Sequence, residues 1–288
     1  MAYANFILPV VEEHIAQGLD RDCIFAKDCH TLFEGKATDV GESVKIIGLG
    51  DPPITTVHKK EIYKGIGLPE KIDDLSVDMP INSLSFFNFM IDDIDRMQSK
   101  FGLEGIINKK TMARLASEID SNIANRALDK SVFSMFEGAP KKIVTENTVG
   151  AGEVNVLRVL NQAATILYKN DVPQNEEIVA NVSPEFYERY IWALGGRATN
   201  NTEILEKGRV SRYGNITVKM SNNVATSQGG AVEHIMVRTK QAIAYARTHI
   251  HTEAYRPEDF FADAVKGFVL YDSKVVKPKE LVVIPVTY

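Results

Sequence analysis

The stretch Leu281-Val282-Val283-Ile284-Pro285-Val286 has the composition of a buried β-strand, since all six residues are apolar and four of them are β-branched. It closes a region, residues 208–288, in which one strand-like segment follows another. A strand of this kind so late in the chain predicts that the end of the chain is tied into a sheet. The region contains no nucleophile elbow and no phosphate-binding loop. We therefore expect the function to lie in how the parts are arranged.

The composition is typical of a globular protein and excludes some classes of function. The 288 residues include 38 acidic and 33 basic side chains, which gives a formal charge of −5 and argues against a broad basic face for nucleic acid. The first residues lack the basic leader of a signal peptide, and no stretch is long enough to cross a bilayer. The only two cysteines, Cys23 and Cys29, predict free thiols in an intracellular setting.

The first third of the chain has the pattern of an arm followed by a long hairpin. Residues 1–34 alternate apolar and charged positions and look like an arm. Two predicted strands, 44–49 and 75–81, flank an exposed loop at 54–73, and the second strand is predicted to run on through Phe87 and Phe89. A two-stranded projection of this kind is barely stable alone, so it needs a surface to lie on.

The middle of the chain is predicted to contain the helices. The proline-free stretch from Asp92 to about Lys130 predicts a long helix, and its part from 106 to 130 alone would be about 37 Å long. Ser183-Pro184-Glu185 has the pattern of a helix start, with a capping side chain followed by proline and an acid. The elements predicted after the long helix are strand 142–145, helix 154–167, strand 177–182, helix 184–194 and strand 215–220.

The most enzyme-like group is His249, His251 and Glu253. Alternate residues of a strand share a face, so this group would present two imidazoles and a carboxylate to a metal ion. The alternative is a polar strand face or a subunit contact, and we favour it because no further ligand pattern is evident.

A second candidate metal group is Cys23, Cys29 and His30. Their spacing is not that of a zinc finger, and small buried thiols are the favoured interpretation.

Two further patterns have ordinary structural explanations. Gly150-Ala151-Gly152 before a helix suggests a dinucleotide-binding loop, but the third glycine of that motif is replaced by Asn155, so a simple turn is favoured. Asp92, Asp93 and Asp95 could serve acid–base chemistry, yet carboxylates at a predicted helix start are usually caps that match the helix dipole.

The order of these parts resembles the major capsid (coat) proteins of tailed bacteriophages. The resemblance extends over nearly the whole chain, and it lies in the order and spacing of short structural motifs. The local sequences that are similar to the family's are Ile91-Asp92-Asp93-Ile94-Asp95-Arg96-Met97-Gln98, Ile119-Asp120, Val182-Ser183-Pro184-Glu185-Phe186-Tyr187, the strand at 214–223, Gln241-Ala242-Ile243-Ala244-Tyr245-Ala246, Tyr255-Arg256-Pro257, Ala262-Asp263-Ala264-Val265-Lys266-Gly267, Tyr271 and Val276-Lys277-Pro278.

This resemblance implies an α+β fold and a structural, non-enzymatic protein without cofactor or metal. It implies self-assembly into pentamers and hexamers of an icosahedral shell that encloses double-stranded DNA. The segments that it implies are an N-arm at 1–40, an E-loop hairpin at 41–90, the spine helix with part of the P-domain at 91–150, the A-domain at 151–230, and the P-domain with the closing strands at 231–288.

The resemblance also implies partners and a location. The expected partners are other copies of the chain, a separate scaffolding protein, a portal protein, a possible decoration protein and packaged DNA without sequence-specific contact, with no membrane. The expected location is the virion capsid, assembled in the host bacterial cytoplasm. Because the arm leads from Met1 directly to the hairpin, we expect no cleaved pro-region.

Some members of this family form isopeptide links between an E-loop lysine and a P-domain asparagine of a neighbour. The hairpin offers Lys59, Lys60 and Lys64, which are otherwise expected to be solvated or to meet acidic groups of a neighbouring subunit. However, residues 231–288 contain no asparagine. We therefore expect no cross-link of this type.

Two alternatives to the phage capsid hypothesis remain at this stage. An encapsulin-like compartment shell shares the fold but encloses protein cargo, and nucleic acid inside purified particles would distinguish the two. The less favoured alternative is a metal-dependent enzyme that uses His249, His251 and Glu253.

Overall fold

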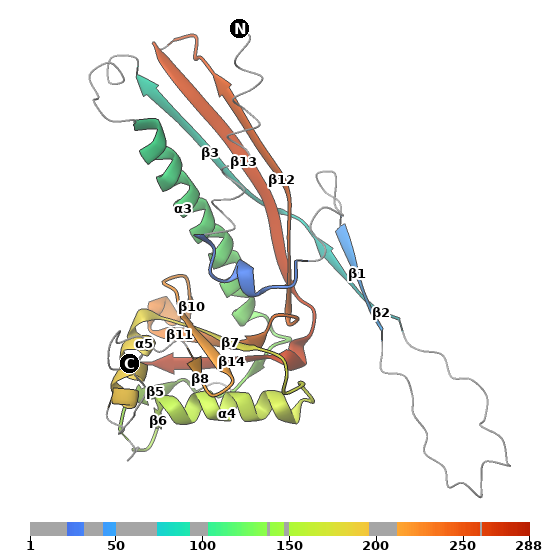
Figure 1. Ribbon diagram of the computed structural model, residues 1–288, viewed down its shortest axis with the longest axis vertical. Coiled ribbons are helices and arrows are strands. Elements are labelled where there is room, and N and C mark those ends of the chain that lie inside the picture. The colour runs from blue at the N-terminus through green and yellow to red at the C-terminus, as the bar shows by residue number, and fades with distance from the viewer. Residues whose placement is uncertain are drawn as a thin grey trace, which may run out of the picture.

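The computed structural model describes residues 22–31, 43–49, 74–92, 103–136, 139–146, 150–195, 212–259 and 261–288. They form a mixed nine-stranded sheet with two helices, a three-stranded antiparallel sheet with one long helix, and a two-stranded hairpin that extends away from both (Figure 1). The predicted α+β fold class is confirmed. None of the described helices is both long enough and apolar enough to span a membrane.

The three-stranded sheet and the long helix form the elongated half of the molecule (Figure 1). The strand order is β12 (Ile243–Tyr255), β13 (Ala262–Val275) and β3 (Ser83–Asp92), with antiparallel neighbours. Helix α3 (Leu103–Asn125) runs along one face and continues as the 3-10 turn η3 (Arg126–Leu128). The predicted apolar stripe is confirmed, because the stripe residues 115, 116, 119, 123 and 127 are buried.

Gly267 allows β3 and β13 to carry large aromatic side chains on the face toward α3. A Cβ atom at Gly267 would lie 2.5 Å from the ring of Phe87 and 2.7 Å from the carbonyl oxygen of His251. Both distances are shorter than van der Waals contact, so a larger residue would force the ring and the strand apart.

Strands β1 (Ser43–Leu49) and β2 (Asp74–Pro80) form the predicted antiparallel hairpin. Only its base is anchored, because Val44, Ile46 and Met79 pack on residues of β12 and β13. The prediction that the return strand continues through Phe87 and Phe89 in the same hairpin is wrong, since β3 pairs with β13 instead. Pro80 has no N–H to donate, and the chain changes sheets directly after it.

The predicted helix start at Asp92 is also wrong. This residue ends β3 and pairs with Ala262, so the chain is still extended there. Asp93 and Asp95, together with the lysines at positions 59, 60 and 64, lie outside the described residues.

The nine-stranded sheet has the late apolar stretch near its centre. Strand β14 (Leu281–Thr287) lies between β11 (Val232–Thr239) and β5 (Lys141–Val144), which confirms that the end of the chain is tied into a sheet. The main strand order is completed by β6 (Glu153–Asn155) on one side and by β7 (Ile178–Val182), β9 (Ile216–Met220) and β8 (Arg212–Tyr213) on the other, with β4 (Phe133–Ser134) beside β14 and β10 (Ala225–Ser227) beside β11.

This sheet combines strands from segments that the sequence separates. Strands β7 and β9 come from residues 151–230, whereas β11 and β14 come from 231–288. The segment boundary at 230 therefore does not separate two sheets. Strand β11 is the antiparallel partner of both β7 and β14, so the sheet cannot be continuous without it.

The two faces of the central strands differ in chemistry. Residues paired across neighbouring strands share a face. One face carries mainly aliphatic side chains from the central strands, with Thr239 and Glu233 near the ends of β11; the aliphatic positions are 178, 180, 182, 235, 237, 282, 284 and 286. The other carries Arg238, Asn181 and Lys219 between apolar neighbours. Helix α4 (Val156–Lys169) lies on the side of the sheet away from α3 (Figure 1).

Local caps fix both helices of this half. Asn155 Oδ1 accepts from the N–H groups of Leu157 and Arg158 at 3.0 and 3.2 Å, which starts α4. Ser183 Oγ accepts from the N–H of Phe186 at 3.2 Å and starts α5 (Pro184–Gly195), as the sequence predicts. The predicted turn at 150–152 is confirmed by Gly152, whose φ of 88° suits glycine.

Candidate functional site

The group His249, His251 and Glu253 does lie along one strand, β12. Glu253 pairs with Lys266 of β13 at 2.8 Å, and the hydrogen bond from this lysine lowers the pKa of the Glu253 carboxyl. The ring of His251 lies 5.7 Å from that of Phe268. Among the described side chains, no group of three or more His, Cys, Asp or Glu is placed to hold a metal ion. The arrangement favours the polar strand face, on which the carboxylate is engaged by an ammonium group.

The second candidate group lies at a different place, in the junction between the two sheets. Cys23 and Cys29 are buried and form no disulfide, which agrees with the interpretation as buried thiols. Burial raises the pKa of the Cys29 thiol, which donates a hydrogen bond to the carbonyl oxygen of Phe25 at 3.3 Å. His30 makes a strand bridge to Ala244. These residues belong to packing and not to a zinc site.

The turn at Gly150 is unsuited to a phosphate group. The N–H of Gly150 donates to the carboxylate of Glu153 at 3.2 Å, so a negative charge already occupies the position that an anion would take.

Several exposed apolar side chains lie together on the three-stranded sheet, on the face away from α3. Leu84, Phe86 and Met90 of β3 alternate along this face, and 76% of Phe86 is exposed. They stand beside Leu270, Phe268 and Ala264 of β13, to which they are paired in register. The base of the hairpin covers Leu270 but leaves the β3 residues open. We call Leu84, Phe86 and Met90 the outer-face patch.

A groove of about 670 Å³ runs between β3 and α3. It combines an apolar wall from β3 with cationic side chains from α3, Lys110 and Arg114. Strand β3 is also an edge strand of its sheet. Two further large side chains are exposed: Phe261, at the start of β13, by 85%, and Trp192, on α5, by 72%. Exposed aromatic residues of this size are enriched where proteins meet partners.

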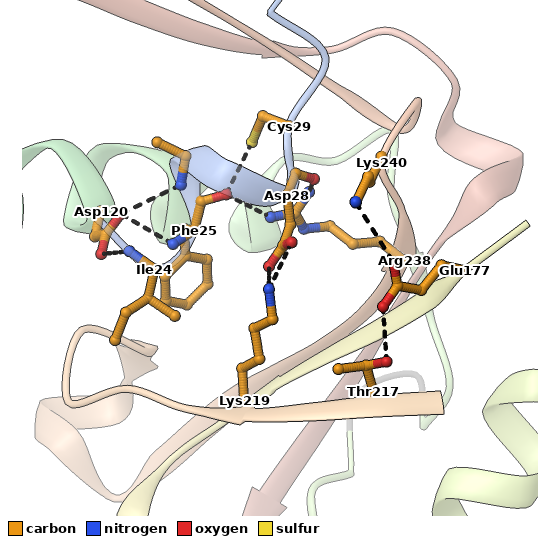
Figure 2. Close-up of polar contacts among 11 residues, drawn as sticks. Ile24, Phe25, Asp28, Cys29, Asp120, Glu177, Thr217, Lys219, Arg238 and Lys240 are labelled. Carbon is orange, nitrogen blue, oxygen red and sulfur yellow. Dashed lines mark hydrogen bonds and ion pairs between the residues drawn. The ribbon is translucent and has the colours of Figure 1, made fainter. Parts of the chain in front are cut away.

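A network of polar contacts connects the amino-terminal segment to both halves of the molecule (Figure 2). Residues 22–31, which include the 3-10 turn η1 (Ala26–Asp28), lie between α3 and the nine-stranded sheet. Asp120 of α3, which is 2% exposed, accepts hydrogen bonds from the N–H groups of Ile24, Phe25 and Ala26 at 2.8, 3.0 and 3.4 Å. Burial raises the pKa of the Asp120 carboxyl, whereas these N–H groups and Arg238 act to lower it.

The nine-stranded sheet binds the same segment through the segment's own carbonyl groups. Arg238 of β11 is fully buried and donates to the carbonyl oxygens of Phe25, at 3.0 Å, and of Asp28. Lys219 of β9 contacts both carboxylate oxygens of Asp28, at 2.7 and 2.8 Å. The segment thus presents the N–H groups of residues 24–26 to Asp120 of α3 and the carbonyl groups of Phe25 and Asp28 to Arg238 of the nine-stranded sheet.

The sequence matches no family model and no curated protein. Its fold is similar to that of solved virus structures. A structure from Mycobacterium phage Che8 superposes with a TM-score of 0.69 and 24% identity, covering 91% of this chain and 90% of that one. The capsid structure of cyanophage P-SCSP1u gives a TM-score of 0.65 at 16% identity, with 91% and 87% covered.

The chain has the tailed-phage major capsid fold.

A third structure with this capsid fold is the virus-like particle from Pyrococcus furiosus. It gives a TM-score of 0.59 at 10% identity, with 96% of this chain and 99% of that chain covered. Coverage of 91% or more of the chain in each case means that the likeness is not confined to one half of the molecule.

Sequence reasoning missed the polar network of this capsid fold, although traces of it are visible in the sequence. Asp120 stands four residues after Ala116 and three before Ile123, which places a carboxylate on the apolar stripe of the predicted helix. Arg238 likewise follows Met236 on the same face of an apolar strand. A charged residue at a core position predicts a buried partner, but not which segment supplies it.

Proposed function

We propose that this chain is the structural major capsid protein of a phage. In this role it assembles into pentamers and hexamers of an icosahedral shell that encloses double-stranded DNA. The observation that supports the proposal is the combination of the capsid fold over 91% of the chain with large apolar side chains left exposed on the outer-face patch. A subunit with an enzymatic role would need a convergent set of reactive groups, and Glu253 and the turn at Gly150 make structural contacts instead.

The hairpin gives this role a physical basis. Among the described residues, strands β1 and β2 pair only with each other, and the hydrophobic contacts seen for the hairpin lie at its base. A two-stranded ribbon is marginally stable in water, so lying across a neighbouring subunit would stabilise it. The outer-face patch offers an apolar surface for such a contact, and many interfaces of this kind add up to a stable closed shell.

The segments of the chain then take the following roles in the shell. The hairpin within 41–90 acts as the E-loop, α3 as the spine helix, and the three-stranded sheet as the P-domain. The nine-stranded sheet with α4 and α5 acts as the A-domain, and residues 1–40 act as the N-arm.

The partners follow from the same role. They are other copies of the chain, a separate scaffolding protein, a portal protein, a possible decoration protein, and packaged DNA that is contacted without sequence specificity. The excess of acidic residues suits a wall that faces packed DNA, because a basic lining would retain the DNA and hinder filling. Assembly takes place in the host cytoplasm and the product is the virion capsid.

A compartment shell with protein cargo is the second candidate function, and the comparisons do not favour it. The structures with TM-scores of 0.69 and 0.65 both come from phages, Mycobacterium phage Che8 and cyanophage P-SCSP1u.

The experiment that tests the proposal is expression of the full chain together with its neighbouring gene products, followed by electron microscopy. Closed shells or hexameric rings are the expected result. A stable monomer that never assembles under these conditions would refute the proposal. Nuclease-protected DNA in the shells supports the phage role, and protein cargo without DNA supports the compartment role.

A further inference from the structure

The segment 22–31 touches both halves of the molecule, and the two halves hold it in different ways. The half that contains α3 and the three-stranded sheet binds its backbone. Asp120 accepts three of its N–H groups, and His30 exchanges hydrogen bonds with β12, from its N–H to the carbonyl of Ile243 at 2.9 Å and from the N–H of Tyr245 to its carbonyl at 3.1 Å. The segment therefore moves with this half.

The other half contributes two long cationic side chains to the segment, beside the hydrophobic core in which Phe25 is buried. Arg238 and Lys219 reach from β11 and β9 to the carbonyl oxygens of Phe25 and Asp28 and to the Asp28 carboxylate. Arg238 and Lys219 project from a face of the sheet on which some buried polar atoms lack a hydrogen bond. On this face the fully buried Asn181 has no partner among the described residues for either polar atom of its side chain. Contacts of this kind depend on distance, and a shift of about 1 Å takes a hydrogen bond beyond its useful range.

Other contacts also join the two halves. The chain crosses between them at three short connections, residues 129–132 from η3 to β4, 240–242 from β11 to β12 and 276–280 from β13 to β14. Ile119 and Ile123 of α3 lie in one hydrophobic core cluster with Val237 of β11, and Ser117 donates a hydrogen bond to Asn223 at 3.0 Å. A change in the angle between the halves would strain this shared core and would also break the contacts of Arg238 and Lys219 with the segment.

We propose that residues 22–31 form a clasp that fixes the angle between the two halves, with Arg238 and Lys219 as the positioning residues that close it. When the clasp opens, the segment keeps its hydrogen bonds to α3 and β12 and loses those to the nine-stranded sheet, whose position then depends on the shared core and the chain connections. The clasp thereby couples the position of the amino-terminal segment to subunit shape. Its effect on shell geometry rests on the proposed capsid function, whereas the opening itself is a property of the isolated subunit.

The two thiols of the chain provide a direct measure of opening. Cys23 and Cys29 are the only cysteines, both lie in the clasp segment, and both are buried. A water-soluble maleimide can therefore react with the native protein only when the segment opens. We expect Arg238→Met, which removes the donors and keeps the volume, to increase the labelling rate at least tenfold.

Two further variants make the test specific. Lys219→Met removes only the contact to Asp28, and because the Lys219 side chain is one-third exposed, its loss leaves no buried cavity. It should increase labelling in the same direction by a smaller factor. The control is Glu177→Gln, since Glu177 bonds Thr217 at 2.8 Å and Lys240 at 3.4 Å in the same region and acts on the clasp only through its charge near Lys219, without a hydrogen bond to it (Figure 2). Its labelling rate should equal that of the wild type.

The second measurement is the diameter distribution of assembled particles. Uniform wild-type shells, with a broader distribution for Arg238→Met and Lys219→Met, would support the clasp.

Wild-type labelling rates in both variants would overturn the clasp, even if all proteins assemble. Fast labelling of both variants with an unchanged, uniform diameter would overturn its role in shell geometry. If Arg238→Met fails to fold, Lys219→Met alone decides. Failure of the wild type to assemble would instead refute the capsid function, and the labelling result would still test the clasp.

Discussion

At the scale of single residues, His234 shows how burial makes a side chain sensitive to pH. It lies on β11, and its Nε2 shares a hydrogen bond with Ser227 Oγ of β10 at 2.8 Å. Burial lowers the pKa of the His234 imidazole below its ordinary value. The neutral form is therefore favoured in the folded chain more than in the unfolded chain.

The expected consequence is a loss of stability at acid pH. As pH falls below about 6.5, the unfolded chain takes up a proton on this histidine while the folded chain resists, so the free energy of unfolding decreases. Above that pH the contribution is constant. We expect His234→Gln, which keeps a polar partner for Ser227, to lose less stability than the wild type between about pH 7.5 and pH 5.5. Urea midpoints at the two pH values measure this, and equal losses in both proteins would contradict it.

At the scale of secondary structure, Asn155 determines where α4 begins. Its Oδ1 caps two N–H groups, and its Nδ2 donates to the carbonyl oxygens of Thr145 and Glu146 at 3.1 and 2.9 Å. We expect Asn155→Ala to lower the free energy of unfolding by about 1–2 kcal/mol, because the cap is lost and the two carbonyls are left without this donor. Asn155→Asp retains only the cap, so its urea midpoint should lie between those of the wild type and the alanine variant. A wild-type midpoint for the alanine variant would show that the cap is dispensable.

The outer-face patch is a feature of strand β3. Because 76% of Phe86 is exposed, Phe86→Ser should change the stability of the free subunit by less than about 0.5 kcal/mol. Shell yield should fall strongly, since the apolar contact with a neighbour is lost. Sedimentation of assembly mixtures measures the yield, and Phe86→Leu serves as the apolar control. Normal yield from the serine variant would exclude this patch from the subunit interface.

The elements that could be predicted from sequence are those set by local patterns. The caps and apolar stripes of α4 and α5, and the alternation of β9 and β14, need no knowledge of distant partners. The partner of β3 could not be predicted, because an alternating pattern is the same whichever strand lies beside it. Its actual partner, β13, begins at Ala262, far away in sequence. The contacts of Arg238 and Asp120 could not be predicted for the same reason, since the segment that they bind is far from both in the sequence.

At the scale of the whole molecule, a shell of this subunit is expected to be held by non-covalent contacts alone. Residues 231–288 contain no asparagine to accept an isopeptide bond from a hairpin lysine of a neighbour. Particles boiled in detergent should therefore give only monomer on a denaturing gel. A ladder of larger species would refute this, and the intact mass of the monomer would also test the expectation that no pro-region is removed.

The central place of β14 has a consequence for synthesis in the cell. Residues 281–287 fill the position between β11 and β5, which are already made when that stretch leaves the ribosome. Until then the sheet has a gap at its centre, and the strands on either side have unpaired edges. A chain that is broken off or still being translated before residue 281 thus cannot present a finished subunit to a growing particle. In the proposed shell, this order of strands would act as a check on completeness and keep partial products out of the assembly.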